Sequence, residues 1–495
     1  MTFISIEFTI LLAAAVFGYY LFPLKHRWLI LLVFSIAFYL QGGIIMFIIV
    51  MATSLVTYLA AIWIEKTDAG RKRKRRCILI SIVATVCGLL ILCKMYAYYE
   101  WNVSWFVIPI GISYYTFSII SYLADVYWKK DKAEQNFLKY LLFTLFFPKI
   151  MQGPISRHNT LGPQLYTGHR LNYKNFTFGL QLIVWGGCKK LVIAERANIF
   201  VNYVYTNLDQ YAESGAILIV TSILSVIQLY CDFSGYMDIA MGISQLFGIA
   251  IDSNFAHPFF SKSAAEFWRR WHITLGDWFR DYVYMPIVIS PWLAKFSQKI
   301  KRQYGKRAGK IIRSAVPLSI VWILTGLWHG TGINYLIWGL YWAVIIILSD
   351  LLEPSINKVN KLLRIKTETV YWKLFQMIRT GILFCIGKII SSQHSLQNVK
   401  TIIGGILRHL NLQELRTGRL YEAGLDHADF RIILTGCVIL TVVSWRQEKG
   451  SIREAVSRWH CLPRWIFYGV SAVVVLLLGV YGESTDNISF AYMYF

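Results

Sequence analysis

The sequence contains none of the short motifs that mark the common soluble enzymes. It has no Gly-x-Ser-x-Gly nucleophile elbow, no P-loop, no Gly-x-Gly-x-x-Gly fingerprint and no His-Glu-x-x-His pair. It also lacks an internal repeat of solenoid period and a low-complexity linker. We therefore find no soluble catalytic domain in this chain and no repeat architecture.

Paired cysteines are absent as well. The eight cysteines form no Cys-x-x-Cys pair and show no metal-ligand spacing. Most lie in apolar runs, so we interpret them as small core residues. The two histidines discussed below are too few for a zinc site, which needs three or four ligands, and we expect no metal.

Acidic residues are scarce. The chain has 27 Asp and Glu against 50 Lys and Arg, a formal net charge of +23. Such a surplus could indicate nucleic acid, but the basic residues cluster in short loops between apolar runs. Membrane orientation and contact with anionic lipids explain that distribution, so we expect membrane lipids and no nucleic acid as partners.

Long apolar runs are what the chain does have. It is 56% hydrophobic, and several runs reach the roughly 20 residues that span a bilayer core. This composition predicts an all-α polytopic membrane protein, with residues 1–495 forming a single domain. The apolar runs lie near residues 3–22, 28–40, 44–64, 77–97, 104–124, 177–200, 214–250, 316–350, 370–390, 430–445 and 464–482.

The basic loops predict the orientation of these runs. The densest loop, residues 65–76, is expected in the cytoplasm, and the loops at 295–313 and 446–458 likewise. Counting spans from there places the N-terminus and the tail at 482–495 outside, with an outer loop near 98–102. The N-terminus lacks a basic n-region and a small-residue cleavage site, so we expect the first span to be retained.

Residues 137–152 are apolar but too short for a comfortable crossing. They lead into Phe147-Pro148-Lys149 and then Gly153-Pro154. Irregular backbone at membrane depth has to be buried in protein or line a wet cavity. We therefore predict a re-entrant or interfacial segment here.

The stretch at residues 266–286 is far too polar and Arg-rich to cross a bilayer. Ser263 and Glu266 fit a capping box, which predicts that a helix begins there. Glu266 is placed to pair with the arginines one turn later. An aromatic and apolar stripe then recurs at steps of three and four residues, formed by Trp268, Trp271, Leu275, Trp278 and Tyr282.

Two histidines lie in polar, aromatic-rich breaks of this apolar sequence. His272 stands beside the stripe, and His329 is bracketed by Gly326, Gly330 and Gly332. Neutral imidazole can take a proton from an attacking hydroxyl near physiological pH, so both are candidates for general-base work. A structural histidine hydrogen-bonded between helices is the alternative for each.

Other polar residues have weaker signals. Asp277, Arg280 and Asp281 could form a network that holds their helix against its neighbours. Asp232 and Asp238, set in an apolar run, could pair with the arginines of the 266–286 stretch or relay protons in a transporter. His158 and His257 are expected in loops, and His257 precedes Pro258 and should mark a turn.

At these residues the sequence resembles the membrane-bound O-acyltransferase (MBOAT) family, in its bacterial alginate O-acetyltransferase branch. The matches follow the family's order over most of the chain. The residues that carry the resemblance are 109–117 with 121–125, 147–149 with 153–155 and Arg157, 228–240, 266–272 with 280–284, and 326–330.

The resemblance implies a ring of about 11 tilted transmembrane helices with re-entrant and interfacial helices around a central tunnel. It implies that His329 is the catalytic residue and His272 the second signature histidine. Acetyl-CoA would be the cytoplasmic donor. The supporting side chains expected around the histidines are Trp328, Trp268, Trp271, Arg269, Arg270, Asp277, Arg280, Asp281, Gln228, Asp232 and Asn334.

The implied acceptor is a hydroxyl outside a bacterial cell membrane, on a polysaccharide or on an exported partner such as an SGNH-type acetyltransferase. The chain departs from the family pattern at Cys188 and Cys231, where Phe is frequent, and after Pro286, where no Gly-Gly turn follows. The related D-alanyl transfer protein of teichoic acid synthesis shares the histidines but uses a carrier-protein thioester. Pro286 and the Arg269-Arg270 pair favour the acetylating branch.

Two other classes of function remain open from the sequence. A transporter or flippase would use Asp232 and Asp238 for proton coupling and would move substrate without cleaving a thioester. A scaffold would dock a partner enzyme and keep its role without either histidine. The histidine-centred stretches favour the enzyme.

Overall fold

The computed structural model describes residues 3–99, 107–393 and 395–481. Across these ranges the regular elements are helices, joined by one isolated β-bridge between Phe255 and Trp271. The all-α prediction is confirmed. The outer loop expected near 98–102 lies mostly outside the described residues, and the tail at 482–495 lies wholly outside them.

Nine helices in the described part of the chain are long and apolar enough to cross a membrane. This confirms a polytopic membrane protein. The ring of helices, the tunnel and the orientation of the termini stay predictions. The nine are Ile44–Lys66, Lys72–Tyr98, Tyr173–Thr206, Gly215–Leu246, Pro291–His329, Ile333–Leu362, Val370–Ser392, His427–Gln447 and Cys461–Leu478.

The chain forms two compact units. The first comprises residues 1–190, 233–253 and 453–495, and the second comprises residues 191–232 and 254–452. Helix α12 (Gly215–Leu246) contributes to both residue sets. That the whole chain acts as one domain stays a prediction.

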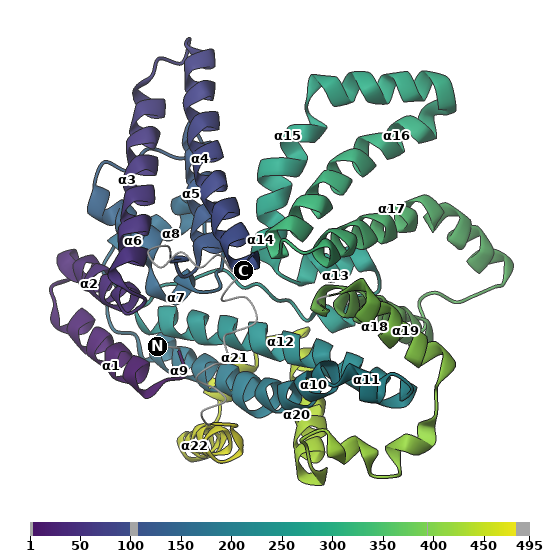
Figure 1. The fold of residues 1–495 in the computed structure, drawn as a ribbon. Coiled ribbons are helices and arrows are strands. Elements are labelled where there is room, and N and C mark those ends of the chain that lie inside the picture. Colours follow the sequence, from purple (N-terminus) through teal and green to yellow (C-terminus); the bar gives the residue numbers. More distant parts are fainter. Residues whose placement is uncertain (1–2, 100–106, 394, 482–495) are drawn as a thin grey trace. The chain divides into compact units, whose positions relative to one another are not determined.

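The first unit is built on a group of helices that pack side by side, α3, α4 and α5 (Figure 1). Nearly every side chain of α5 is buried by the protein. Its polar residues are therefore kept away from lipid. The helices of this unit are α1 (Ile6–Leu21), α2 (Arg27–Leu40), α3 (Ile44–Lys66), α4 (Lys72–Tyr98), α5 (Ile112–Tyr127), α6 (Phe137–Leu145), α7 (Phe147–Ile150), α8 (His158–Tyr166), α9 (Tyr173–Gly187) and α22 (Cys461–Leu478).

The segment at 137–152, expected to be too short for a full span, forms two short helices. Asn136 caps α6 by accepting hydrogen bonds from two backbone amides, and α7 ends at Ile150 after a single turn. Gly153 then takes a positive φ of 90° that favours glycine. No long helix forms here, and the re-entrant or interfacial placement stays a prediction.

Glycines let α9 approach the last part of α12 closely. A Cβ on Gly186 would lie 2.5 Å from the Gly235 carbonyl oxygen, and one on Gly179 would lie 2.7 Å from that of Gly242. Small residues at a helix crossing in a membrane protein allow the backbones this contact. The two pairs set a tight crossing in the first unit.

The second unit is dominated by α16 and α17, which run side by side (Figure 1). A π-helix, Arg280–Tyr284, follows α14. The helices of this unit are α10 (Glu195–Thr206), α11 (Leu208–Tyr211), α13 (Ala264–Arg270), α14 (Ile273–Phe279), α15 (Met285–Val288), α16 (Pro291–His329), α17 (Ile333–Leu362), α18 (Val370–Ser392), α19 (Leu396–Arg408) and α20 (His427–Gln447).

The cysteines are less buried than their apolar surroundings predicted. Cys93 and Cys231 are buried, but Cys77 and Cys461 are exposed. Both exposed residues lie near the first turn of a helix, where the side chain has few neighbours. The other four cysteines, Cys87, Cys188, Cys385 and Cys437, are half-buried, so the interpretation as core residues was wrong for the two exposed ones.

Candidate functional site

His272 lies at a break between two short helices. The sequence predicted one helix after Ser263, but α13 ends at Arg270 and α14 starts at Ile273. His272 takes a left-handed backbone conformation with φ 49° and ψ 51°. Such a conformation is uncommon for a residue with a Cβ and is a signal of a special position. The single continuous helix was wrong.

The break is held by an extended segment that precedes α13 in the sequence. The Asn254 side-chain oxygen accepts hydrogen bonds from the Thr274 amide at 3.0 Å and its hydroxyl at 2.7 Å. The Asn254 carbonyl accepts from the Ile273 amide at 3.1 Å. Asn254 is fully buried. It thus replaces the helical hydrogen bonds that the first turn of α14 lacks.

Sequence reasoning missed Asn254. A buried asparagine in a short polar loop carries no signal of its partner 20 residues away. Only the pairing of Phe255 with Trp271 brings that loop against the break. An Asn that follows Asp252 and Ser253 is at most a hint of a turn.

His329 is the last residue of α16 and is 7% exposed. Two glycines let α17 approach it closely. A Cβ on Gly326 would lie 2.4 Å from the Tyr335 carbonyl oxygen, and one on Gly339 would lie 2.4 Å from that of Trp322. The glycines around His329 therefore serve close backbone packing, as the sequence suggested.

The two histidines contact the same indole, that of Trp328. The ring centroid of Trp328 lies 5.7 Å from that of His272 and 4.8 Å from that of His329. His329 also contacts Trp338, and their ring centroids are 5.0 Å apart. Two residues 57 positions apart in the sequence thus share one aromatic wall, within a single compact unit.

A cluster of tryptophans supports this wall. Trp268, on α13, has its ring 4.8 Å from Trp322 on α16 and 5.0 Å from Trp342 on α17. Trp271 packs on Phe384 of α18 at 4.9 Å. Aromatic pairs at these separations contribute about 0.5–1.5 kcal/mol each beyond area burial. The first two residues of the predicted stripe, Trp268 and Trp271, thus belong to a packing surface that joins α13, α16, α17 and α18.

Burial controls the charge of His272. The side chain is 3% exposed, and removal from water lowers its pKa from 6.5 to about 3, although a backbone hydrogen bond opposes this in part. His272 is therefore neutral at physiological pH. A neutral imidazole can accept one hydrogen bond and donate one, but it cannot supply a positive charge.

The predicted helix start and ion pair are confirmed. The Ser263 hydroxyl accepts from the Glu266 amide at 3.2 Å, and Arg270 pairs with Glu266 at 2.9 Å. Arg270 also reaches Glu448 at 2.6 Å, just beyond the end of α20. Arg269, by contrast, is exposed. Arg270 thus ties the start of this stretch to a distant helix, while Arg269 points outward.

The network expected at Asp277, Arg280 and Asp281 forms, but it is local. Arg280 pairs with Asp277 at 2.6 Å and with Asp281 at 2.9 Å, and the three side chains are 36–57% exposed. Exposed ion pairs of this kind contribute little to stability. These pairs connect neighbouring turns of one segment and do not clamp it against another helix.

The remaining expected residues have separate surroundings. Gln228 is half-buried and Asp232 buried on α12, where Asp232 lies within electrostatic range of Lys388 on α18. Asn334, at the start of α17, donates from its amide to the Gln393 carbonyl. In the first unit, Asp238 forms an ion pair with Lys189 at 2.7 Å. The pairing of Asp238 with arginines of the 266–286 stretch is thus replaced by a lysine partner.

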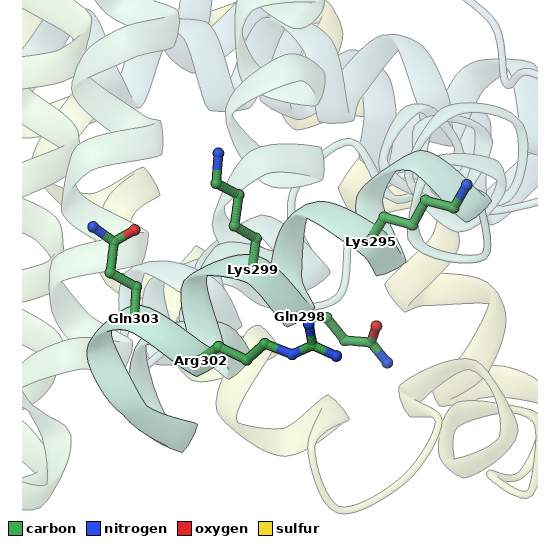
Figure 2. A pocket seen from close by; sticks show the side chains of 5 residues that line it. All are labelled: Lys295, Gln298, Lys299, Arg302 and Gln303. Carbon is green, nitrogen blue, oxygen red and sulfur yellow. The ribbon is translucent and has the colours of Figure 1, made fainter.

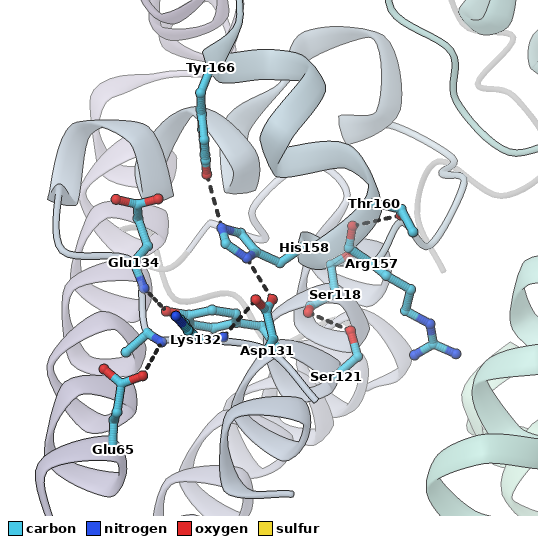
Figure 3. A network of polar contacts seen from close by, with 12 residues as sticks. Glu65, Ser118, Ser121, Asp131, Lys132, Glu134, Arg157, His158, Thr160 and Tyr166 are labelled. Atoms are coloured by element: carbon cyan, nitrogen blue, oxygen red, sulfur yellow. Dashed lines mark hydrogen bonds and ion pairs between the residues drawn. The ribbon is translucent and has the colours of Figure 1, made fainter. Parts of the chain in front are cut away.

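The two histidines expected in loops differ. His257 has φ 50° and precedes the short 3-10 helix Pro258–Phe260, so the predicted turn is confirmed. His158 is instead buried as the first residue of α8. Figure 3 shows its ring between Asp131, at 2.8 Å, and the Tyr166 hydroxyl, at 3.1 Å. With both ring nitrogens engaged, His158 joins α8 to the loop before α6 and has a structural role.

No group of three or more His, Cys, Asp or Glu side chains within residues 3–99, 107–393 and 395–481 is arranged to hold a metal ion. The residues at the site are aromatic, amide and imidazole groups. Their chemistry is proton transfer and hydrogen bonding in a largely apolar setting.

Comparison with known proteins gives one family. The model of the membrane-bound O-acyltransferase family matches residues 131–299, a range that includes His272. A protein of Pseudomonas syringae pv. tomato named probable alginate O-acetylase AlgI is 26% identical over 427 residues. A peptidoglycan O-acetyltransferase of Helicobacter pylori is 30% identical over 356 residues. A teichoic acid D-alanyltransferase of Bacillus subtilis is 31% identical over 250 residues.

The alignments cover these relatives to different extents. The first covers 83% of this chain and 76% of the Pseudomonas protein. The second covers 65% of this chain and 63% of the Helicobacter protein, and the third 49% of this chain and 59% of the Bacillus protein. The family match and these relatives together support acyltransferase activity.

Proposed function

The chain belongs to the membrane-bound O-acyltransferase family, and from this we propose that it moves acetyl groups from cytoplasmic acetyl-CoA across the membrane to hydroxyl groups of an exported or cell-surface polysaccharide. Transfer is direct or passes through an extracytoplasmic partner. Two of its relatives are named as O-acetylating proteins, one for alginate and one for peptidoglycan. We assign it to the membrane of a bacterial cell, with both termini outside.

One observation carries the proposal most directly. The two histidines that the family resemblance singles out are both buried, and both contact Trp328 within one compact unit. Buried ionisable side chains in membrane proteins are functional candidates. The arrangement supports a common role for His272 and His329.

His329 is the proposed general base. Its imidazole takes the proton of the acceptor hydroxyl while the oxygen attacks the acetyl carbonyl carbon. The new C–O ester bond forms, the C–S thioester bond breaks, and the imidazolium returns its proton to the departing thiolate. General-base assistance of this kind is worth about 10²–10⁴-fold in rate.

His272 is the proposed positioning partner. Because burial keeps it neutral, it can donate one hydrogen bond toward the carbonyl oxygen of the donor as negative charge develops there. The left-handed backbone of His272 and the Asn254 hydrogen bonds to Ile273 and Thr274 fix the chain at the break from which the ring projects. Fixed donors are effective because they need no reorganisation during the reaction.

The runner-up function is D-alanyl transfer to teichoic acid from a carrier-protein thioester. The Bacillus relative favours it with 31% identity, over about half of this chain. The O-acetylating relatives align over more of the chain, which favours the acetyl donor. Both functions use the same acyl-transfer chemistry and differ in how the thioester is presented.

The transporter and scaffold alternatives have less support. A proton-coupled transporter would use Asp232 and Asp238 as titrating groups. Asp238 is engaged with Lys189, which also donates to the Ser234 hydroxyl, and Asp232 lies within electrostatic range of Lys388. A scaffold function would assign no chemical role to the two buried histidines.

The test is thioester turnover by the full chain in lipid nanodiscs. Acetyl-CoA carrying a labelled acetyl group is added with a candidate exported acceptor, and free thiol and transferred label are followed over time. His329→Ala is expected to lower turnover by about 10²–10⁴-fold. His409→Ala, at an exposed histidine of the same unit, serves as the control and should match wild type.

The outcomes separate the candidates. Wild-type turnover by His329→Ala would refute the assignment of the base. Turnover only with an acylated carrier protein would select the D-alanyl function. An absence of thioester cleavage with either donor and the acceptor, in protein shown to be folded, would reject the enzyme and restore the transporter.

A further inference from the structure

Helix α16 is longer than a membrane crossing requires. It runs from Pro291 to His329, and Gly305 interrupts it with φ 90° and ψ 170°. Residues 306–329 alone exceed the roughly 20 residues that span a bilayer core. The helical stretch before the interruption, residues 291–304, is therefore surplus to the crossing and lies beyond its end.

This surplus stretch and the turn after it are strongly basic. No acidic residue occurs between Asp281 and Asp350. Such a segment carries an uncompensated positive field that attracts anions. The cationic residues are Lys295, Lys299, Lys301, Arg302, Lys306, Arg307, Lys310 and Arg313.

One side of the stretch packs on the chain and fixes its orientation. Leu293 is fully buried, and the Ser297 hydroxyl donates to the Gly309 carbonyl at 2.9 Å. Gly309 also allows the Lys301 backbone to approach, since a Cβ there would lie 3.2 Å from the Lys301 Cα. Residues 291–304 thus fold back on the turn that follows Gly305, with the opposite side facing outward.

The outward side combines cations with large apolar side chains. Trp292 is 52% exposed and Phe296 40% exposed. Helical spacing places both beside Lys299, one and two turns along. We define the basic face as Trp292, Lys295, Phe296, Lys299 and Arg302.

A shallow hollow of about 530 Å³ lies on the basic face. Figure 2 shows its lining side chains projecting from successive turns of a single helix. A hollow whose walls all come from one helix does not enclose a small molecule. Its binding partner has to be a broad surface that covers the open side of the hollow. The lining residues are Lys295, Gln298, Lys299, Arg302 and Gln303.

We propose that the basic face is a docking surface for anionic phospholipid headgroups of the surrounding bilayer. Aromatic side chains settle at the headgroup level, and lysine and arginine bind the lipid phosphates. Residues 291–304 then lie along the membrane surface. The surface thereby holds the start of α16, and with it the helix that ends in His329, at a set depth.

The phosphates of a nucleotide-bearing thioester donor are the competing source of negative charge. Such a donor needs an enclosed site for its base and phosphates, whereas the walls of this hollow all belong to one helix. The exposed Trp292 and Phe296 also need an apolar environment, which a bilayer offers over the length of the stretch. The lipid surface is the better match.

The test uses the full chain in nanodiscs of phosphatidylcholine, alone or mixed two to one with phosphatidylglycerol. Hydrogen exchange of residues 291–304 and the lipids retained after detergent extraction are measured by mass spectrometry. The variant Lys295→Gln/Lys299→Gln/Arg302→Gln removes three charges from the basic face. Its control, Lys358→Gln/Lys361→Gln/Arg364→Gln, removes three exposed charges near the end of α17.

We expect phosphatidylglycerol to slow exchange of residues 291–304 in the wild type and in the control. The first variant should lose this protection and at least tenfold of its enrichment in retained phosphatidylglycerol, since each of the three cations contributes about 1 kcal/mol, roughly fivefold, near the membrane surface. Equal exchange with and without phosphatidylglycerol would overturn the proposal. Protection by acetyl-CoA in pure phosphatidylcholine, with no effect of phosphatidylglycerol, would overturn it in favour of the donor.

Discussion

Gly326→Ala is expected to damage catalysis while leaving the protein folded. A Cβ at position 326 would lie 2.4 Å from the Tyr335 carbonyl oxygen. Real Cβ atoms keep 3.4–4 Å from such neighbours. Because the obstacle is backbone, α16 and α17 have to separate by about 1 Å, and a displacement of that size near a reacting group costs about 10²-fold in rate.

The reason for expecting a local effect is the position of Gly326, one turn before His329. The Gly330 amide donates to the Gly326 carbonyl at 3.1 Å, so the end of α16 moves with residue 326. Alanine also favours a helix over glycine by about 1 kcal/mol, which offsets part of the packing loss. Stability should therefore change less than turnover.

The assay compares thioester turnover and the thermal unfolding midpoint of wild type and variant in the same nanodiscs. Gly381→Ala is the matched control, because a Cβ at this helical position in α18 meets no atom within 4 Å. The control should keep its turnover and gain slightly in stability. Wild-type turnover by Gly326→Ala would refute the claim that the close approach of α16 and α17 positions His329.

Two further predictions concern His272 and the contact that holds it. Asn254→Ala should destabilise the protein by about 1–3 kcal/mol, because it removes the side-chain acceptor of the buried Thr274 amide. The variant should also have lower turnover. Chemical unfolding measures the first effect and the thioester assay the second. The pKa of His272 is about 3 in the folded protein and 6.5 in the unfolded chain, so between these values only the unfolded chain binds the proton. The contribution of His272 to the free energy of unfolding is therefore complete above pH 6.5 and falls as the pH drops toward 3. His272→Gln should therefore flatten the acid side of the stability profile, and an unchanged slope would contradict the neutral, buried imidazole.

Much of the fold follows from local features of the sequence. Long apolar runs predict membrane helices because a span has to satisfy its own backbone hydrogen bonds inside the bilayer. The cap at Ser263 and the pair between Glu266 and Arg270 also form as predicted, because each joins residues within one helical turn. The segment at 137–152 was expected to be too short for a span because of its length alone, and it forms two short helices.

The break at His272 was beyond the reach of such local reasoning. Periodicity continues through Trp271 and Leu275, so the sequence predicts an unbroken helix. The chain breaks there because Asn254 and Phe255 offer alternative backbone partners from another part of the sequence. Periodicity reports which side chains share a face, and it does not report which backbone groups find partners elsewhere.

The sequence alone determined the class of protein and the two histidines worth testing, since composition and local motifs need no knowledge of the fold. The tertiary structure alone decided that His272 and His329 share Trp328, that Asp238 pairs with Lys189, and that burial keeps His272 neutral. These outcomes depend on contacts between residues far apart in the chain. Only the packing of whole helices brings such residues together and removes them from water.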